Sequence, residues 1–159
     1  MPDWIEPGQK APAFTLTADD GSQVSLAKLA GSPVVLYFYP KDDTPGCTKE
    51  ACAFRDLKAE LQKLGAKVFG VSPDDVASHA QFRDKYQLNF PLLADPDHVT
   101  ADKYGAWREK NMYGNKSMGV QRSTFLIDPA GKVDRVWKRV QVDGHDRQVL
   151  EALKELKQN

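Results

Sequence analysis

Hydrophobic positions along the chain follow two different periods, and their order predicts alternating strands and helices. Residues 34–39 form a continuous apolar run rich in β-branched and aromatic side chains, and residues 67–72 form a second one. Such runs are typical of strands buried on both faces. Between them, apolar residues recur at helical spacing from Phe54 onward and predict a helix over residues 45–64. The first half of the chain therefore contains a strand–helix–strand unit.

The remaining segments show the same kinds of pattern. In chain order they predict a hairpin over residues 13–26 with its turn at Asp20–Gly21, a helix over about 74–86, a short extended piece over 90–95, a weaker helix over 97–107, a strand–turn–strand unit over 123–137 and a helix over 145–157. This order implies an α/β fold, with a central mixed β-sheet flanked by helices and an N-terminal β-hairpin. For residues 107–120, which are basic, we favour an ordinary surface loop over a segment that borders a substrate pocket or a partner site.

Length and charge exclude several classes of protein. With 159 residues, 41% of them hydrophobic, the chain can bury a core without a metal or disulfide, and we expect one domain over residues 1–159. Lys+Arg and Asp+Glu both number 22, which leaves no excess of positive charge for nucleic acid or anionic lipid. No apolar run is long enough to span a bilayer, and residues 1–7 lack the features of a signal peptide. We therefore expect a cytoplasmic protein, in which the two cysteines are not a structural disulfide.

The segment after the first buried strand, Pro40 to Cys52, carries the candidate chemistry, because sites in α/β sheets form beyond the carboxyl ends of strands. Thr44 and Pro45 have the residue types of an N-cap and a first helical residue, which places Cys47 in the first turn. Unpaired amides and the helix dipole there favour a thiolate, the reactive form of cysteine. The same amides and the Thr44 hydroxyl are candidates to stabilise charge on oxygen. The alternative is a cysteine that only packs in the core.

Cys52 lies five residues after Cys47 on the same predicted helix. Ideal helix geometry turns the two side chains about 140° apart and separates their Cα atoms by roughly 8–9 Å. A disulfide needs Cα atoms within about 7 Å, so the pair cannot bridge while the helix is intact. Two interpretations of Cys52 stay open: an unrelated surface or partner-covered cysteine, or a resolving thiol that reaches Cys47 after the first turns unwind.

Other kinds of site are less favoured. His79, His98 and His145 are scattered and form no metal-ligand spacing with the cysteines. We expect His79 at the edge of the core and His145 in a local hydrogen bond. The C-x-x-C pair of thioredoxin-like reductases is missing. A cysteine protease stays open, because its histidine need not be near the thiol in sequence. We expect Asp42 and Asp43 to form a solvated turn.

The sequence "FYPKDDTPGCTKEACAFRD" resembles the active-site segment of peroxiredoxins, whose P-x-x-x-T-x-x-C motif is matched by Pro40, Thr44 and Cys47. Its C-x4-C spacing is similar to that of the bacterioferritin comigratory protein, or peroxiredoxin Q, branch. The likeness to this branch continues in "VSPDDVASHAQFRDKY", "FPLLADPD" and "VQRSTFLIDPAGKV", so it covers nearly the whole chain. The resemblance implies a thioredoxin-like fold and a thiol peroxidase that acts on hydrogen peroxide and organic hydroperoxides.

Carried over to this chain, the resemblance implies a role for each matching residue. Cys47 would be the peroxidatic cysteine, Thr44 would hydrogen-bond the peroxide, and Pro40 would shield the site from water. The active-site arginine of the family falls on Arg122, which would stabilise the thiolate and the transition-state oxygens. Glu50 would orient Arg122. Without the resemblance, Arg122 and Glu50 have the residue types of ordinary surface positions.

The resemblance also matches Cys52 to the resolving cysteine of this branch, and the chain has no third cysteine. We expect a Cys47 sulfenic acid, a Cys47–Cys52 disulfide, and its reduction by thioredoxin or a similar dithiol protein. We expect no metal or organic cofactor, and a monomer or weak homodimer that binds neither nucleic acid nor membrane. The competing hypotheses are a peroxide-sensing redox-switch binding protein and a general thiol–disulfide reductase.

Overall fold

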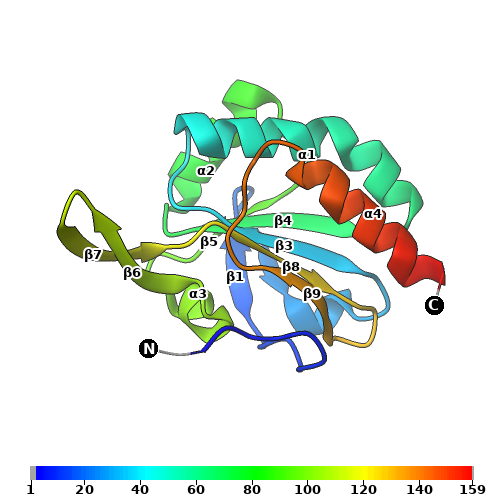
Figure 1. Ribbon diagram of the computed structural model, residues 1–159. Helices are drawn as coiled ribbons and strands as arrows, with labels where there is room; N and C mark the ends of the chain where they lie inside the picture. Colours follow the sequence, from blue (N-terminus) through cyan, green and yellow to red (C-terminus); the bar gives the residue numbers. More distant parts are fainter. Residues whose placement is uncertain (1–2, 159) are drawn as a thin grey trace.

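The computed structural model describes residues 3–158, so residues 1, 2 and 159 of the predicted domain lie outside the described range. Its centre is a seven-stranded mixed sheet with the strand order β2-β1-β5-β4-β3-β8-β9 (Figure 1). The strands are β1 (Thr15–Ala18), β2 (Gln23–Ser25), β3 (Val34–Phe38), β4 (Lys67–Ser72), β5 (Leu92–Ala94), β8 (Ser123–Ile127) and β9 (Val133–Trp137). β1 and β2 pair antiparallel, which is the expected N-terminal hairpin.

Strand β3 lies in the middle of this sheet, parallel to β4 and antiparallel to β8. Every residue of β3 and β8 is buried. Both faces of the sheet are covered there, which is why these strands have continuous apolar sequences. The register pairs Phe38 with Val71 on one side and with Ser123 on the other. The end of β3 therefore lies beside the beginning of β8.

Helices cover both faces of the sheet (Figure 1). They are α1 (Pro45–Lys63), α2 (Val76–Tyr86), α3 (Val99–Tyr104), α4 (His145–Gln158) and the 3-10 helix η1 (Leu26–Leu29). Helices α1, α2 and α4 pack on the face that carries Tyr37 and Tyr39, and α3 packs on the face that carries Leu36 and Phe38. This arrangement confirms the predicted α/β fold. In the described part of the chain, no helix is both long and apolar enough to cross a bilayer.

Residues 107–120 form a hairpin, so the prediction of a surface loop is wrong. β6 (Trp107–Met112) pairs with β7 (Asn115–Val120) in a separate two-stranded sheet that projects from the main one (Figure 1). The turn between them has positive φ at Tyr113 (54°) and Gly114 (82°), as type I′ turns require. Most of the described side chains of the hairpin are exposed. The alternation that marks a half-buried strand is therefore missing from its sequence.

Two helices are shorter than expected for reasons of backbone conformation. The helix expected over 97–107 is α3, which ends at Tyr104 because Gly105 has a left-handed φ of 88°. The helix expected from about residue 74 begins at Val76. Its N-cap is Asp75, whose side chain accepts a hydrogen bond from the Ser78 amide. The other two predicted helices agree with α1 and α4 within one residue at each end.

Gly70 of β4 makes room for the ring of Tyr37 on the neighbouring strand. The two residues are cross-strand partners. A Cβ atom at Gly70 would lie 2.8 Å from Tyr37 Cζ and 2.9 Å from its hydroxyl oxygen. The other side of the Tyr37 ring stacks on Phe54 of α1, at a centroid distance of 5.0 Å. A side chain at position 70 would therefore push Tyr37 against α1.

We expect Gly70→Ala to lower the free energy of unfolding by about 1–3 kcal/mol, as other overpacking substitutions do. Gly119→Ala is the matched control, because a Cβ atom there meets only the flexible Lys110 side chain, at 3.3 Å. Urea denaturation of the two variants measures the difference. Equal stabilities would contradict this explanation of Gly70.

Candidate active site

Cys47 lies in the first turn of α1, directly beyond the end of β3. Thr44 precedes the helix with an extended backbone (φ −93°, ψ 157°), and Pro45 is the first helical residue. Both positions were predicted from the residue types. The Thr44 hydroxyl donates to the carbonyl oxygen of Lys41 at 2.9 Å and makes no cap hydrogen bond. The Thr44 side chain thus caps none of the amides of the first turn.

Arg122 brings a guanidinium group to the thiol. It stands immediately before β8, and the pairing of Ser123 with Phe38 sets it beside the end of β3. Its Nη2 atom lies 3.3 Å from Cys47 Sγ, which is hydrogen-bond distance for sulfur. Cys47 is buried, with 1% of its surface exposed. Its sulfur therefore meets a cation in a place that excludes water, and such a donor stabilises negative charge on sulfur.

Glu50 lies one turn after Cys47 and holds the other side of the same guanidinium. Arg122 Nη1 is 2.8 Å from Glu50 Oε1. The carboxyl is 2% exposed, and Oε2 has no hydrogen-bond partner among the described residues. Burial raises the pKa of Glu50 to about 7, against the lowering effect of Arg122. The expected orientation of Arg122 by Glu50 thus has a geometric basis, because the guanidinium spans the thiol and the carboxylate.

Gly46 allows Arg122 to come this close to the helix. A Cβ atom at position 46 would lie 3.1 Å from Arg122 Nη2 and 3.8 Å from its Cζ. The shorter of these is tighter than ordinary van der Waals contact, so a side chain would require the guanidinium to shift by a few tenths of an ångström. Gly46 also weakens the helix start, because glycine loses more conformational freedom on folding than any other residue.

Cys52 shares helix α1 with Cys47 but does not contact it. The helix is continuous from Pro45 to Lys63, and both cysteines are free, Cys47 buried and Cys52 half-buried. Five residues apart in an unbroken helix, their Cα atoms are too far from each other for a disulfide. Any bridge between them requires the beginning of α1 to unwind.

Asp42 is buried, so the expected solvated turn is wrong for this residue. Four side chains hold it: Tyr39 Oη at 2.6 Å, Ser78 Oγ at 2.8 Å and His79 Nδ1 at 2.7 Å from the carboxylate, and Asp74 Oδ2 at 2.8 Å from the backbone amide. His79 is fully buried, deeper than the expected place at the edge of the core. Asp43, the next residue, is exposed as expected.

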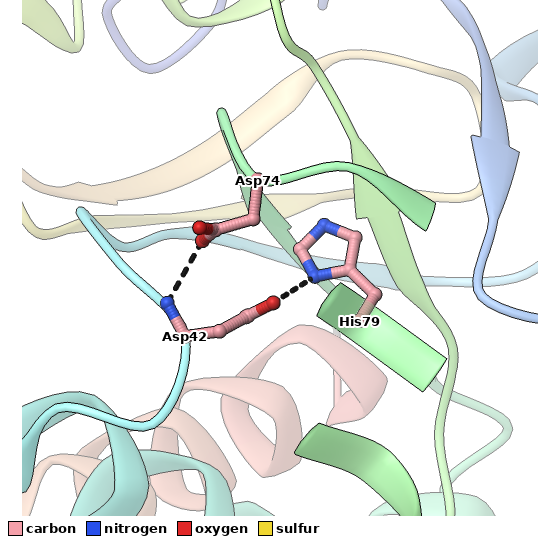
Figure 2. Close-up of side chains that lie close together, drawn as sticks. All are labelled: Asp42, Asp74 and His79. Atoms are coloured by element: carbon pink, nitrogen blue, oxygen red, sulfur yellow. Dashed lines mark hydrogen bonds and ion pairs between the residues drawn. The ribbon is translucent and has the colours of Figure 1, made fainter. Parts of the chain in front are cut away.

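The ligand atoms of Asp42, Asp74 and His79 lie within 4.8 Å of one another, a spacing that would suit a metal ion (Figure 2). These atoms already have hydrogen-bond partners. Asp74 Oδ2 accepts from the Ser72 hydroxyl at 2.6 Å, and His79 Nε2 lies 3.0 Å from the carbonyl oxygen of Leu93. Hydrogen bonds within the described residues therefore account for this cluster, and we assign it no metal.

Lys110 of β6 brings a second cation toward the site. Its side chain is half-buried and passes across Gly119. Burial lowers the pKa of Lys110, and repulsion from Arg122 lowers it further, while attraction to Cys47 opposes both. The β6–β7 hairpin thus carries a positive charge that acts on Arg122 and Cys47.

Comparison with known proteins agrees with this geometry. The model of the AhpC/TSA family matches residues 7–136, more than half of the chain. The chain belongs to the AhpC/TSA family. A Coxiella burnetii relative that carries the bcp name is 52% identical over 149 residues, which cover 94% of this chain and 99% of the relative. Peroxiredoxin Bcp of Bacillus subtilis is 45% identical over 152 residues, 96% of this chain and 97% of that protein.

A solved structure shows the same likeness. The Xanthomonas campestris bacterioferritin comigratory protein, whose structures were described for alkyl peroxide reduction activity, has a TM-score of 0.90 to this chain at 42% identity. The match covers 96% of this chain and 99% of that one. The predicted membership of the peroxiredoxins, in the bacterioferritin comigratory protein branch, is confirmed, and so is the thioredoxin-like fold.

In this peroxiredoxin, three of the expected site residues meet directly: Cys47, Arg122 and Glu50. Pro40 and Thr44 lie in the segment that leads into α1, and Pro40 is half-buried. Sequence reasoning missed Asp42 and Lys110.

A signal for Asp42 existed, because a histidine on an apolar helix face needs buried hydrogen-bond partners, and His79 lies on such a face. Lys110 carried no comparable signal, because most of its neighbours along the hairpin are exposed. For His145 the expected local hydrogen bond is confirmed, with Gln148 Oε1 at 3.1 Å. A second contact, with Thr124 Oγ1 at 2.8 Å, joins it to β8.

The raised pKa of Glu50 makes stability depend on pH. Between 4.5 and about 7, folded Glu50 keeps a proton that the unfolded chain has released, so the free energy of unfolding falls as pH rises through this window. Across this window, the pKa difference lowers the free energy of unfolding by about 3 kcal/mol. We expect this slope in urea denaturation of the wild type between about pH 5 and about pH 7, and we expect Glu50→Gln to remove it.

The exposed carboxylate of Glu60, which lies 3.6 Å from Arg147, provides the control. Glu60→Gln removes an acidic group from the same helix without removing a buried one, so it should keep the wild-type slope. If Glu50→Gln also kept that slope, the burial of an ionised Glu50 would not be its cause.

Proposed function

We propose that this peroxiredoxin reduces hydrogen peroxide and organic hydroperoxides with Cys47 as the peroxidatic cysteine. The observation that carries the proposal is the 3.3 Å contact between Cys47 Sγ and Arg122 Nη2 at the beginning of α1. The alkyl peroxide reduction described for the Xanthomonas campestris protein supports organic hydroperoxides as substrates.

The first step transfers an oxygen atom to sulfur. The Cys47 thiolate attacks the terminal oxygen of the hydroperoxide, an S–O bond forms, and the O–O bond breaks. Two electrons pass from sulfur to the departing oxygen, which takes up a proton and leaves as an alcohol or water, and Cys47 becomes a sulfenic acid. We assign the charge on the oxygens to Arg122 and the first-turn amides, and the exclusion of water to Pro40. The Thr44 hydroxyl joins them as a donor when its proton turns from the Lys41 carbonyl oxygen to the peroxide.

The second step uses Cys52 as the resolving cysteine. Its thiol attacks the sulfenic sulfur, an S–S bond forms, and the oxygen leaves as water. Because α1 is unbroken from Pro45 to Lys63, its first turns must unwind before this attack. Thioredoxin or a similar dithiol protein then reduces the disulfide by thiol–disulfide exchange and is itself oxidised.

The cycle as proposed takes both electrons from thiols, so it needs no metal or organic cofactor. The reducing dithiol also suggests the compartment, because the cytoplasm keeps such proteins reduced. We therefore propose an antioxidant enzyme of the cytoplasm that works as a monomer or weak homodimer.

Cys47→Ser tests the nucleophile. We expect peroxide-dependent NADPH oxidation, coupled through thioredoxin and its reductase, to fall on the order of 10⁴-fold or more, as for the loss of other enzymic nucleophiles. Unchanged turnover would refute the assignment. A slow wild-type enzyme that is nevertheless oxidised once by peroxide would favour a sensor, and insulin reduction faster than peroxide reduction would favour a general reductase.

Cys52→Ser separates the two steps of the cycle. We expect this variant to reduce about one equivalent of peroxide per chain and then to cycle at least about tenfold more slowly with thioredoxin, because no internal disulfide forms. Mass spectrometry after one equivalent of peroxide should show the loss of two hydrogens in the wild type and a gain of oxygen in the variant. Full cycling by Cys52→Ser would show that another thiol resolves the sulfenic acid.

A further inference from the structure

The segment between β3 and α1, residues 40–44, is held by a buried network to which the proposed chemistry gives no role. At its centre is Asp42, five residues before Cys47. His79 Nδ1 lies 2.7 Å from the Asp42 carboxylate, and Asp74 Oδ2 accepts from the Asp42 amide at 2.8 Å. Asp42 is thus bound at both its side chain and its backbone from outside the segment, as Figure 2 shows.

His79 connects Asp42 to the centre of the sheet. The ring is fully buried, and its Nε2 lies 3.0 Å from the carbonyl oxygen of Leu93 in β5. A carbonyl oxygen only accepts hydrogen bonds, and so does a carboxylate that already accepts from two hydroxyl groups. Both ring nitrogens thus lie against buried oxygen atoms. The loss of either side chain leaves a buried polar group of the other short of a hydrogen-bond partner, which is costly away from water.

Asp43 adds an attachment on the exposed side. Its backbone is left-handed, with a φ of 57°, and its carboxylate accepts hydrogen bonds from Lys85 and Tyr86 of α2, both at 2.7 Å. The chain passes from these two attached aspartates into the first turn of α1 after a single residue, Thr44. A displacement of the aspartates therefore displaces the helix start.

We propose that Asp42 and His79 are positioning residues that anchor the segment before Cys47. The proposal rests on the peroxidase cycle proposed above. With the anchor in place, Cys47 stays against Arg122 for the attack on peroxide. When the first turns of α1 unwind for disulfide formation, the segment before them stays in place. Without the anchor, the contact between Cys47 and Arg122 weakens and the first turns unwind more readily. The two steps then change in opposite directions, which a general loss of stability does not explain.

Two substitutions of His79 separate the two hydrogen bonds of the ring. In His79→Asn the amide nitrogen takes the place of Nδ1 and still donates to Asp42, whereas in His79→Gln it takes the place of Nε2 and faces Leu93. Stopped-flow fluorescence measures the two steps. We expect His79→Gln to form the sulfenic acid about tenfold more slowly than wild type and the disulfide about threefold faster. His79→Asn should shift both rates less.

Hydrogen–deuterium exchange of the reduced protein tests the same anchor without peroxide. We expect the amides of residues 44–52 to exchange about tenfold faster in His79→Gln and in Asp42→Asn than in wild type. Tyr104→Phe is the control for lost stability, because it removes a buried hydroxyl that donates to the Pro12 carbonyl oxygen on the other face of the sheet. It should leave exchange in residues 44–52 unchanged.

The outcomes distinguish the anchor from the proposed function. Slowing of both steps in His79→Gln, or equal effects of Asn and Gln at this position, would overturn the anchor. If His79→Gln does not fold, Asp42→Asn decides, and wild-type exchange in residues 44–52 of that variant would overturn the anchor. A wild-type protein that forms no sulfenic acid, or no Cys47–Cys52 disulfide, would count against the proposed function, while the exchange result would still test the anchor.

Discussion

The contact between the Arg122 guanidinium and the Cys47 sulfur is the interaction on which the rest of the site depends. It joins residues 75 positions apart in sequence. Three features make it possible: β8 pairs antiparallel with β3, Gly46 has no side chain in the way, and Glu50 holds the far side of the guanidinium. One cation therefore serves two acidic groups of the same helix in a place that excludes water.

The proposed cycle makes opposite demands on the beginning of α1. The attack on peroxide needs Cys47 held against Arg122, and disulfide formation needs the same turns to unwind. The structure offers a physical basis for both. Cys47 and the core side of α1 that follows it are buried, whereas the first turn also contains Gly46, which weakens the helix start. Local stability can differ along one helix when its buried contacts differ in this way. The buried contact between Asp42 and His79 adds rigidity on the other side of Thr44.

The sequence was most informative where structure follows from local pattern. The runs at 34–39 and 67–72 agree with β3 and β4, and the helix expected over 45–64 agrees with α1. Burial on both faces and helical periodicity each produce a sequence pattern that can be recognised within a few residues. The hairpin over 107–120 has no such sequence pattern, since both of its faces are largely exposed. Asp42 was misjudged because its burial depends on His79, which is 37 residues away.

By itself, the sequence determined that a cysteine stands in the first turn of a helix after a buried strand, and that Cys52 cannot bridge to it while that helix is intact. Caps, helix rise and helix turn are local properties, so they can be read from neighbouring residues. Only the tertiary structure decided that Arg122 and Glu50 meet at the thiol and that Asp42 is buried against His79. Those contacts come from strand pairing and from the exclusion of water between distant segments, which no local pattern contains.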